Sequence, residues 1–293
     1  MLKNHIQKVL EKYTKKYLKK FQPKVVLVTG SVGKTSTKLA IATVLSEKYR
    51  VRVHPGNHNT HLSVPLAILG IDYPDDIRSW KQWWRVRKAA KKRLKQKEKD
   101  CDVIVQELGT DAPGDVIQFA RYLYAEVAVV TAVSPEHMEY FKTIDAVAAE
   151  ETKMFDYCKK MLINGDDIAG KYLMGRDFEE YSLITNVAHN YYAKPTSKGL
   201  DGQRLHVEFP TGKLDANIKY VGKQGAKFAV AAAAVADMIG ISHHKIAAGL
   251  ERLHAFAGRM QVLDGKKGSI LIDDTYNSSP IAAKAALDVL YSH

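Results

Sequence analysis

The chain has 293 residues, of which 46% are hydrophobic, and a formal net charge of +12. These values are typical of a globular protein with one large domain, or one domain with appendages. The apolar runs are far shorter than the roughly 20 residues of a membrane-spanning helix, and no apolar secretory signal opens the chain. Cys101 and Cys158 show no metal-ligand or redox spacing. We therefore expect reduced, buried thiols and a cytoplasmic protein.

Much of the positive charge lies in two segments, residues 1–21 and 78–99. The first has apolar residues near helical spacing and lysines opposite, which predicts an amphipathic helix. Such segments can contact nucleic acid, an anionic membrane surface or a polyanionic substrate, although a solvated helix face is commoner. Trp80, Trp83 and Trp84 in the second could stack on bases or anchor a basic helix to the core. We expect the anchoring role, with at most weak contact to anionic surfaces.

From residue 24 onward, short β-branched runs alternate with amphipathic stretches, which predicts a parallel, doubly wound sheet with helices on both faces. The expected elements, in order, are strand 24–29, helix 35–48, strand 50–54, helix 64–69, strand 102–107, helix 114–122, strand 127–132, helix 143–158 and strand 161–163.

The second half of the chain has a different pattern. Residues 181–222 are rich in turns and short alternating strands, which indicates a small antiparallel sub-sheet. An Ala-rich helix ending at Gly240 and another over 242–253 follow, and then "SILIDDTYN" predicts a new strand running into a loop. We therefore expect an α/β fold divided into a basic N-terminal helix (1–22), a central domain (23–255, with 78–99 as a basic insert) and the hinge and start of a further domain (256–293).

The stretch "VVLVTGSVGKTSTKLA" (25–40) predicts a phosphate-binding loop. A turn between a strand and a helix N-terminus directs backbone N–H groups at one point, and the helix dipole adds positive charge there. Gly30 and Gly33 would let a phosphate approach the backbone, Lys34 would contact the β/γ-phosphates and the Thr35 hydroxyl would ligate Mg²⁺. Ser31, Val32 and Ser36 complete the loop. The G-x-x-G-K-T spacing is two residues shorter than the general P-loop pattern, and a turn without a ligand is the alternative.

"VTGSVGKTST" resembles the ATP-binding loop of the Mur ligase family, and further stretches match that family in order. The chain is similar to its G-N-x-N-N, E-M-G-A, T-N-V-x-x-x-H, V-x-N-x-D-D and D-D-S-Y-N motifs at "PGNHNTHLSVPLAIL", "VIVQELGTDAPGDV", "AVVTAVSPEHMEYF", "MLINGDD" and "GRMQVLDGKKGSILIDDTYNSSP". The resemblance spans residues 24–293. It is greatest to the members that add D-alanyl-D-alanine to a UDP-N-acetylmuramoyl peptide.

The resemblance implies ligation through an acyl phosphate: ATP phosphorylates a substrate carboxylate, and an amine then attacks it. Lys34 and two Mg²⁺ ions would neutralise the phosphates. Glu107 would bridge the metals from the carboxyl end of its strand, where a solvated acid is the alternative. His137 corresponds to the family's metal-binding histidine, although a lone loop histidine is usually polar surface.

The family usually places a carbamylated lysine on the helix after that histidine, and Glu151 stands at its position here. Its carboxylate would supply a metal ligand directly. Glu150 and Glu151 could instead be exposed helix acids, and Lys153 would face another side of the helix.

The remaining site residues are also implied by the resemblance. Asn57 and Asn59 would bind near the reacting carboxylate, unless they only build a turn. Arg259 would contact the phosphates, Asp274 the ribose and Asn277 the base. The chain departs from the family at Thr60 and Ser63, and it has Gln224, Gly225 and Phe228 at the polar positions of an H-N-x-x-N motif.

The expected function is ATP-dependent amide ligation in peptidoglycan precursor synthesis, with ATP and Mg²⁺ as cofactors and with a UDP-linked muramyl peptide and D-Ala-D-Ala as substrates. Such ligases have three domains, and we expect this chain to hold only the central one and the start of the third. It should therefore bind ATP weakly and ligate poorly alone, because domain closure completes the site. The alternatives are another amide ligase of the superfamily, of the folate or polyglutamate type, or a non-catalytic nucleotide-binding module tethered by its basic helices.

Overall fold

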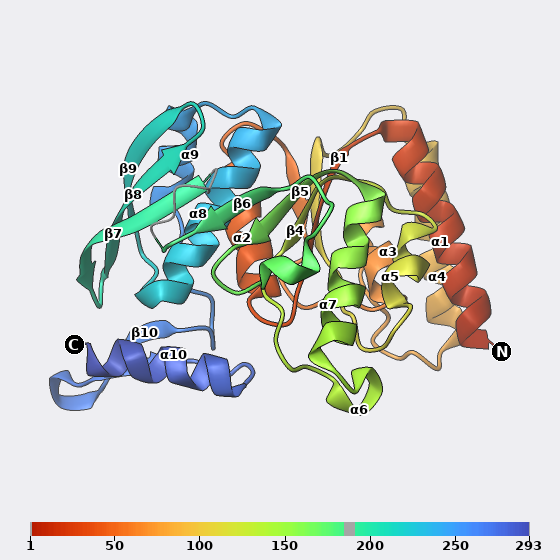
Figure 1. Cartoon of the computed structure of the whole chain (residues 1–293). Helices are drawn as coiled ribbons and strands as arrows, with labels where there is room; N and C mark the ends of the chain where they lie inside the picture. The colour runs from red at the N-terminus through yellow and green to blue at the C-terminus, as the bar shows by residue number, and fades with distance from the viewer. Residues whose placement is uncertain (1, 185–190, 293) are drawn as a thin grey trace.

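The computed structural model describes residues 2–184 and 191–292, and its centre is a nine-stranded mixed sheet (Figure 1). The strand order is β2-β3-β1-β4-β5-β6-β7-β8-β9. Pairing is parallel from β2 to β7 and antiparallel from β7 to β9. The strands are β1 Lys24–Thr29, β2 Val51–Val53, β3 Val103–Glu107, β4 Ala125–Val130, β5 Cys158–Asn164, β6 Glu179–Ser182, β7 Tyr191–Gly199, β8 Gly202–Phe209 and β9 Gly212–Ile218.

Helices cover both faces of this sheet, as the alternation of strands and helices predicts. Alternate residues of β1 point to opposite faces: Val26 and Val28 join one core cluster, and Val25 and Leu27 join the other. The first cluster contains α2 (Lys34–Leu45), α8 (Gly222–Ile239) and α9 (His243–Glu251). The second contains α1 (Leu2–Phe21), α3 (Ser63–Leu69), α4 (Trp80–Lys95) and α5 (Asp115–Ala120). The α/β class predicted from the sequence is therefore confirmed.

The C-terminal segment forms a separate small layer. Strands β10 (Gln261–Asp264) and β11 (Ile270–Asp273) pair antiparallel, and α10 (Pro280–Tyr291) follows. Val289 of α10 packs with Val221 and Met260 beside the start of α8. Figure 1 shows this layer beside the start of α8, with α1 and α4 at the opposite end of the molecule.

The structure differs from the predicted elements mainly at their ends. The helix predicted over 143–158 ends at Thr152 as α7 (Ile144–Thr152), and a 3-10 turn follows over Lys153–Tyr157 because Met154 and Phe155 enter the core. Strand β5 begins three residues before the predicted start, and β10 was not predicted. A four-residue helix, α6 (Met138–Phe141), precedes α7. Residue 1 of the predicted N-terminal helix and residues 185–190 of the predicted antiparallel stretch lie outside the described residues.

Two predictions about side chains need correction or refinement. Trp83 is buried as expected, but Trp80 and Trp84 are 68% and 57% exposed, so they do not anchor α4. Both cysteines are free, and Cys101 is buried, whereas Cys158 is only half-buried. No helix within residues 2–184 and 191–292 combines the length and the apolar character needed to cross a bilayer.

Candidate active site

The turn between β1 and α2 has the backbone geometry of an anion-binding loop. Gly30 and Gly33 have φ values of +120° and +86°, in the region that favours glycine. A Cβ at Gly30 would lie 2.4 Å from Thr131 Oγ1, so no larger residue fits there. Among the described residues, no side chain caps the N-terminus of α2, and the N–H groups of its first turn have no intrahelical partner. These groups and the helix dipole are therefore available to a phosphate.

Lys34, the first residue of α2, lies at the entrance of this loop. Its Nζ donates to the Gly30 carbonyl at 2.5 Å and lies 3.3 Å from Glu136 Oε1. Only 14% of the Lys34 side chain is exposed. The ammonium is thus held at the mouth of the loop by one backbone oxygen and one carboxylate.

A cleft of about 550 Å³ opens above the loop and gathers most of the predicted site. The α1/α4 end of the molecule contributes nothing to its walls. Gly30 and Glu151 are the predicted site residues that do not line it. Those that do are Ser31, Val32, Gly33, Lys34, Thr35, Ser36, Asn57, Asn59, Glu107, His137, Arg259, Asp274 and Asn277.

Below the cleft, a buried ion pair joins two elements of the site. Glu107, at the end of β3, and Lys38, one turn after Lys34 on α2, are each 1% exposed. Lys38 Nζ lies 3.1 Å from Glu107 Oε2 and donates to the Gly56 carbonyl at 2.6 Å. Burial lowers the pKa of Lys38, and the nearby Glu107 carboxylate opposes that shift.

Glu107 is therefore not the solvated strand-end acid that the sequence left open. Neither of its carboxylate oxygens accepts a well-directed hydrogen bond from the described residues. Buried carboxylates are usually hydrogen-bonded, so Glu107, which pairs with Lys38 through Oε2, can still accept a ligand that brings positive charge or donors. Lys38 was missed by sequence reasoning, although its spacing of four residues from Lys34 places both lysines on one side of α2.

A second acidic group surrounds His137, which has a left-handed backbone conformation (φ +48°) just before α6. Its Nε2 lies 3.4 Å from Asp111 Oδ1 and 3.6 Å from Glu136 Oε1. Glu136 thus lies between His137 and Lys34. Sequence reasoning did not single out Glu136, although an acid directly before a predicted metal-binding histidine was a usable signal.

The two adjacent glutamates of α7 are both buried, so the alternative of exposed helix acids is wrong. Glu150 accepts hydrogen bonds from the N–H groups of Gly114 and Val116, at 2.9 and 2.8 Å, and so fixes the start of α5. Glu151 is 1% exposed and accepts hydrogen bonds from the hydroxyls of Thr29 and Thr110. Burial raises the pKa of Glu151, and Lys34 partly opposes this shift.

The donors in the cleft fit Mg²⁺ by their chemistry. Glu107 offers a carboxylate whose Oε2 pairs with Lys38, and the Thr35 hydroxyl and the amides of Asn57 and Asn59 line the same space. Within the described ranges, no three His, Cys, Asp or Glu side chains gather closely enough to hold a metal ion by themselves. Mg²⁺ does not require such a cage, because it commonly takes one or two protein oxygens together with waters and substrate phosphates.

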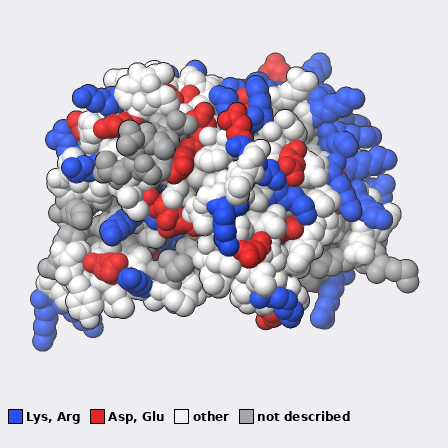
Figure 2. Space-filling view, viewed as in Figure 1, with Lys and Arg blue, Asp and Glu red and all other residues white. Residues whose placement is uncertain are grey.

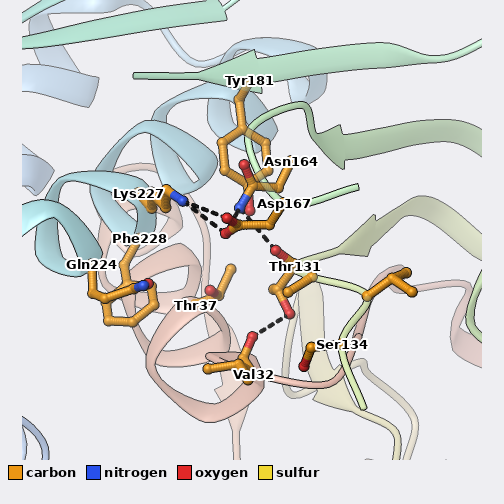
Figure 3. Close-up of a pocket in the computed structure, with 12 residues that line it drawn as sticks. Val32, Thr37, Thr131, Ser134, Asn164, Asp167, Tyr181, Gln224, Lys227 and Phe228 are labelled. Carbon is orange, nitrogen blue, oxygen red and sulfur yellow. Dashed lines mark hydrogen bonds and ion pairs between the residues drawn. The ribbon is translucent and has the colours of Figure 1, made fainter. Parts of the chain in front are cut away.

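A smaller pocket of about 100 Å³ adjoins the cleft and shares Val32 and Ser134 with it (Figure 3). Lys227 points from α8 to Asp167 and lies 2.7 and 2.8 Å from its two carboxylate oxygens. Gln224 and Phe228 line both spaces. A Cβ at Gly33 would lie 2.9 Å from Phe228 Cε1, so this ring packs directly against the phosphate loop.

The C-terminal layer forms the remaining wall of the cleft. The Arg259 guanidinium lies 3.9 Å from the centre of the Tyr276 ring. Asp274 Oδ1 accepts a hydrogen bond from the Met260 N–H at 3.0 Å, and burial raises the pKa of Asp274. Residues 259–277 thus bring a cation, an acid and the Asn277 amide to face the phosphate loop.

Comparison with known proteins agrees with this geometry. The Mur ligase middle domain model matches residues 85–236, which is more than half of the chain, so the chain belongs to the Mur ligase family. The matched residues include Glu107, His137 and Glu151, whereas the phosphate loop lies before them.

The chain is 25% identical over 286 residues to the UDP-N-acetylmuramoyl-tripeptide–D-alanyl-D-alanine ligase of Bacillus subtilis, covering 97% of this chain but 56% of that protein. Among solved structures, MurF from Acinetobacter baumannii has a TM-score of 0.79 at 21% identity, covering 97% of this chain and 58% of that one. MurF from Thermotoga maritima, solved in complex with ADP, has a TM-score of 0.78 at 24% identity, covering 97% and 61%. The chain thus spans little more than half the length of these relatives.

Proposed function

We propose that this chain is the nucleotide-binding core of an ATP-dependent ligase that joins a carboxylate to an amine through an acyl phosphate. The cleft carries this proposal, because it brings the phosphate loop, Glu107, His137 and the segment from Arg259 to Asn277 to one space. Residues 23–255 would form the core, and residues 256–293 would close over the nucleotide.

In this proposal, positively charged groups bind the phosphates, and carboxylate, hydroxyl and imidazole groups bind the metal ion. The first turn of α2 and Lys34 bind the phosphates, and a phosphate oxygen would replace Glu136 as the partner of Lys34. When bound with the nucleotide, Mg²⁺ supplies positive charge against the phosphate oxygens, and Thr35, Glu107 and His137 are the residues that would hold it. Glu151 is a further candidate ligand, but its oxygens accept hydrogen bonds from two threonines.

Recognition of the remaining groups involves both walls of the cleft. The amides of Asn57 and Asn59 would orient the carboxylate that is phosphorylated, and Arg259 would draw negative charge toward the C-terminal layer. Phe228 would offer the base an aromatic surface in place of an amide. The likeness to the Bacillus subtilis ligase favours a UDP-linked muramyl peptide and D-Ala-D-Ala as substrates, in peptidoglycan precursor synthesis.

Calorimetry of ATP binding, with and without Mg²⁺, tests the nucleotide site. Wild type should bind ATP far more tightly with Mg²⁺. Lys34→Ala should lose binding by on the order of a hundredfold, since it removes a charge-assisted contact to the phosphates. Glu107→Gln keeps the side-chain size and should lose the Mg²⁺ dependence, whereas Lys213→Ala, at an exposed position of β9, should bind as wild type does. A folded wild type that binds neither ATP nor MgATP would overturn the proposal.

The substrates need a separate assay. ADP release should rise when a UDP-muramyl tripeptide and D-Ala-D-Ala are added together with MgATP, and an amide product should form. Folate and glutamate in their place should leave ADP release at its basal rate. Stimulation by folate and glutamate alone would instead assign the chain to the polyglutamate type of ligase.

A further inference from the structure

The end of the molecule opposite the C-terminal layer carries an unusual concentration of charge. Helix α1 contains seven lysines and one glutamate, and α4 contains eight Lys or Arg residues and no acid. Together they hold more positive charge than the formal excess of the whole chain, +12, so the rest of the molecule is not basic. Figure 2 shows these blue side chains gathered on the side where Figure 1 places α1 and α4.

Both helices are fixed to the domain by their inner faces, which leaves their outer faces free. Leu10 of α1 and Trp83 and Val86 of α4 form a buried cluster with α3. Asp100, which lies before β3, links both helices to the sheet. Its carboxylate accepts hydrogen bonds from Tyr17 of α1 at 2.6 Å and from Arg93 of α4 at 2.7 Å. The exposed cations are Lys8, Lys12, Lys15, Lys16, Lys19 and Lys20 of α1 and Lys81, Arg85, Arg87, Lys88, Lys91, Lys92 and Lys95 of α4.

An apolar groove of about 180 Å³ runs between the two helices within this cationic surface. Ile6 and Val9 of α1 form one side, and Trp80 and Trp84 of α4 form the other. The two tryptophans are four residues apart, so they lie on one side of α4, and both are mostly exposed. A contiguous exposed apolar patch with a polar rim is typical of an interaction site.

We propose that α1 and α4 form a docking surface for an anionic phospholipid bilayer. The combination of cations with tryptophans at an amphipathic helix surface is the one that binds at the headgroup level of a membrane. The lysines and arginines attract anionic headgroups, and Trp80 and Trp84 enter the boundary between headgroups and acyl chains. The groove favours lipid over nucleic acid as the partner. Ile6 and Val9, beside the indoles, can contact acyl chains, but they form no hydrogen bond or ion pair with a phosphate backbone.

Docking of this kind leaves the proposed ligase site open to its substrates. None of the residues that line the groove also lines the cleft. The surface would therefore place the domain at an anionic membrane without using any residue of the phosphate loop, and its lipid binding needs no nucleotide.

Co-sedimentation with vesicles tests the proposal, using the full chain without nucleotide. The protein should bind vesicles in which about a third of the lipid is phosphatidylglycerol and should not bind pure phosphatidylcholine vesicles. Raising the salt from about 0.1 M to about 1 M shortens the Debye length from about 10 Å to about 3 Å and should release it. Binding should also shift the tryptophan emission to the blue as the exposed indoles leave water.

Two variants separate charge from insertion. Lys88, Lys91 and Lys92→Gln should lower the partition coefficient by on the order of a hundredfold, whereas the matched triple variant Lys213, Lys245 and Lys266→Gln, outside α1 and α4, should leave it unchanged. Trp80→Ser with Trp84→Ser should weaken binding by on the order of tenfold and abolish the emission shift. All these positions are exposed, so folding should persist.

Four outcomes would overturn the proposal. The first is equal binding to anionic and neutral vesicles, and the second is no binding to either. The third is tighter binding to a single-stranded oligonucleotide than to anionic vesicles, with the same loss in the triple variant of α4, which would assign the surface to nucleic acid. A dimer in light scattering that the two tryptophan substitutions dissociate would likewise assign the groove to a second copy of the chain.

Discussion

The cleft and the α1/α4 surface both depend on charge, but they arrange it in opposite ways. In the cleft the charges are few, and lysines face single carboxylates, as Lys38 faces Glu107 and Lys34 faces Glu136. On α1 and α4 the charges are many, exposed and of one sign. The cleft holds individual charged groups at defined distances from one another, whereas the α1/α4 surface produces a positive electrostatic potential through the sum of its charges.

This difference determines what a single substitution can do. A buried charge without its partner carries a large desolvation cost, so each residue of the cleft matters individually. An exposed charge in water contributes little to folding alone, and it acts through the sum of its neighbours at a range set by salt. The contrast with the exposed helices is greatest for the buried pair of Lys38 and Glu107.

Lys38→Met should have the largest effect on stability. It leaves Glu107 buried beside an apolar chain, which should cost about 3–5 kcal/mol of unfolding free energy. It also frees the Gly56 carbonyl that precedes Asn57 and Asn59. Urea unfolding at neutral pH measures the loss.

The double variant Lys38→Met with Glu107→Gln provides the control. Because it removes both charges, it should recover part of the stability, and the cycle should give a coupling of at least about 1 kcal/mol. A Lys38→Met variant that unfolds within about 0.5 kcal/mol of wild type would show that the pair does not hold this part of the fold together.

Asp100→Asn should have the next largest effect, because it weakens the attachment of α1 and α4. Burial alone would raise the pKa of Asp100, but the Tyr17 hydrogen bond and the cations of Arg52 and Arg93 outweigh it, so the pKa lies below its usual value. We expect a loss of about 1.5–3 kcal/mol at pH 7, as for a hydrogen bond to a charged group.

The stability contribution of Asp100 should depend on pH, and the direction of its pKa shift determines how. With a folded-state pKa below the usual 3.8, the stabilising effect of Asp100 is complete well above that pH and is lost as the pH falls through the folded-state value. The stability difference between wild type and Asp100→Asn should therefore shrink in acid. A difference that stays constant down to pH about 3 would contradict the ionic part of the attachment.

Gly33→Ala should affect ligand binding more than folding. The left-handed backbone at this position costs a residue with a side chain about 1–2 kcal/mol, and the new methyl would also press on Phe228. ATP affinity should fall at least tenfold while the fold persists in circular dichroism. Adding Phe228→Ala should relieve the contact and leave the backbone cost, so affinity should recover only in part.

The phosphate loop could be predicted because its chemistry is local. A β-branched run, two glycines and Gly-Lys-Thr at a helix start determine strand, turn and helix within residues 24–45, and β1 has the predicted bounds. Glu107 could be predicted at the carboxyl edge of the sheet for a similar reason, since it directly follows a buried run. In both cases the residues that determine the local structure are neighbours in the sequence.

The contacts that sequence reasoning missed are made between distant segments. The burial of Lys38 depends on β3 lying beside α2, and the burial of Glu150 depends on the N–H groups of α5, so neither has a local signal. The early start of β5 was hidden because Lys159 and Lys160 look like a solvated turn. The sequence predicts that Trp80 and Trp84 anchor α4 to the core, whereas of the three tryptophans it is Trp83 that joins the buried cluster with α3.

Lys88→Gln should have the smallest effect on folding and so gives the most sensitive test of the contrast. Lys88 is exposed, and its Nζ lies 5.4 Å from the centre of the exposed Trp84 ring. Losing this charge should change the unfolding free energy by less than about 0.5 kcal/mol, and it should relieve repulsion from its cationic neighbours. Removing the same single charge at Lys38 should cost several times more. If urea unfolding gave similar losses for the two lysines, burial and pairing could not be what distinguishes the cleft from the helix surface.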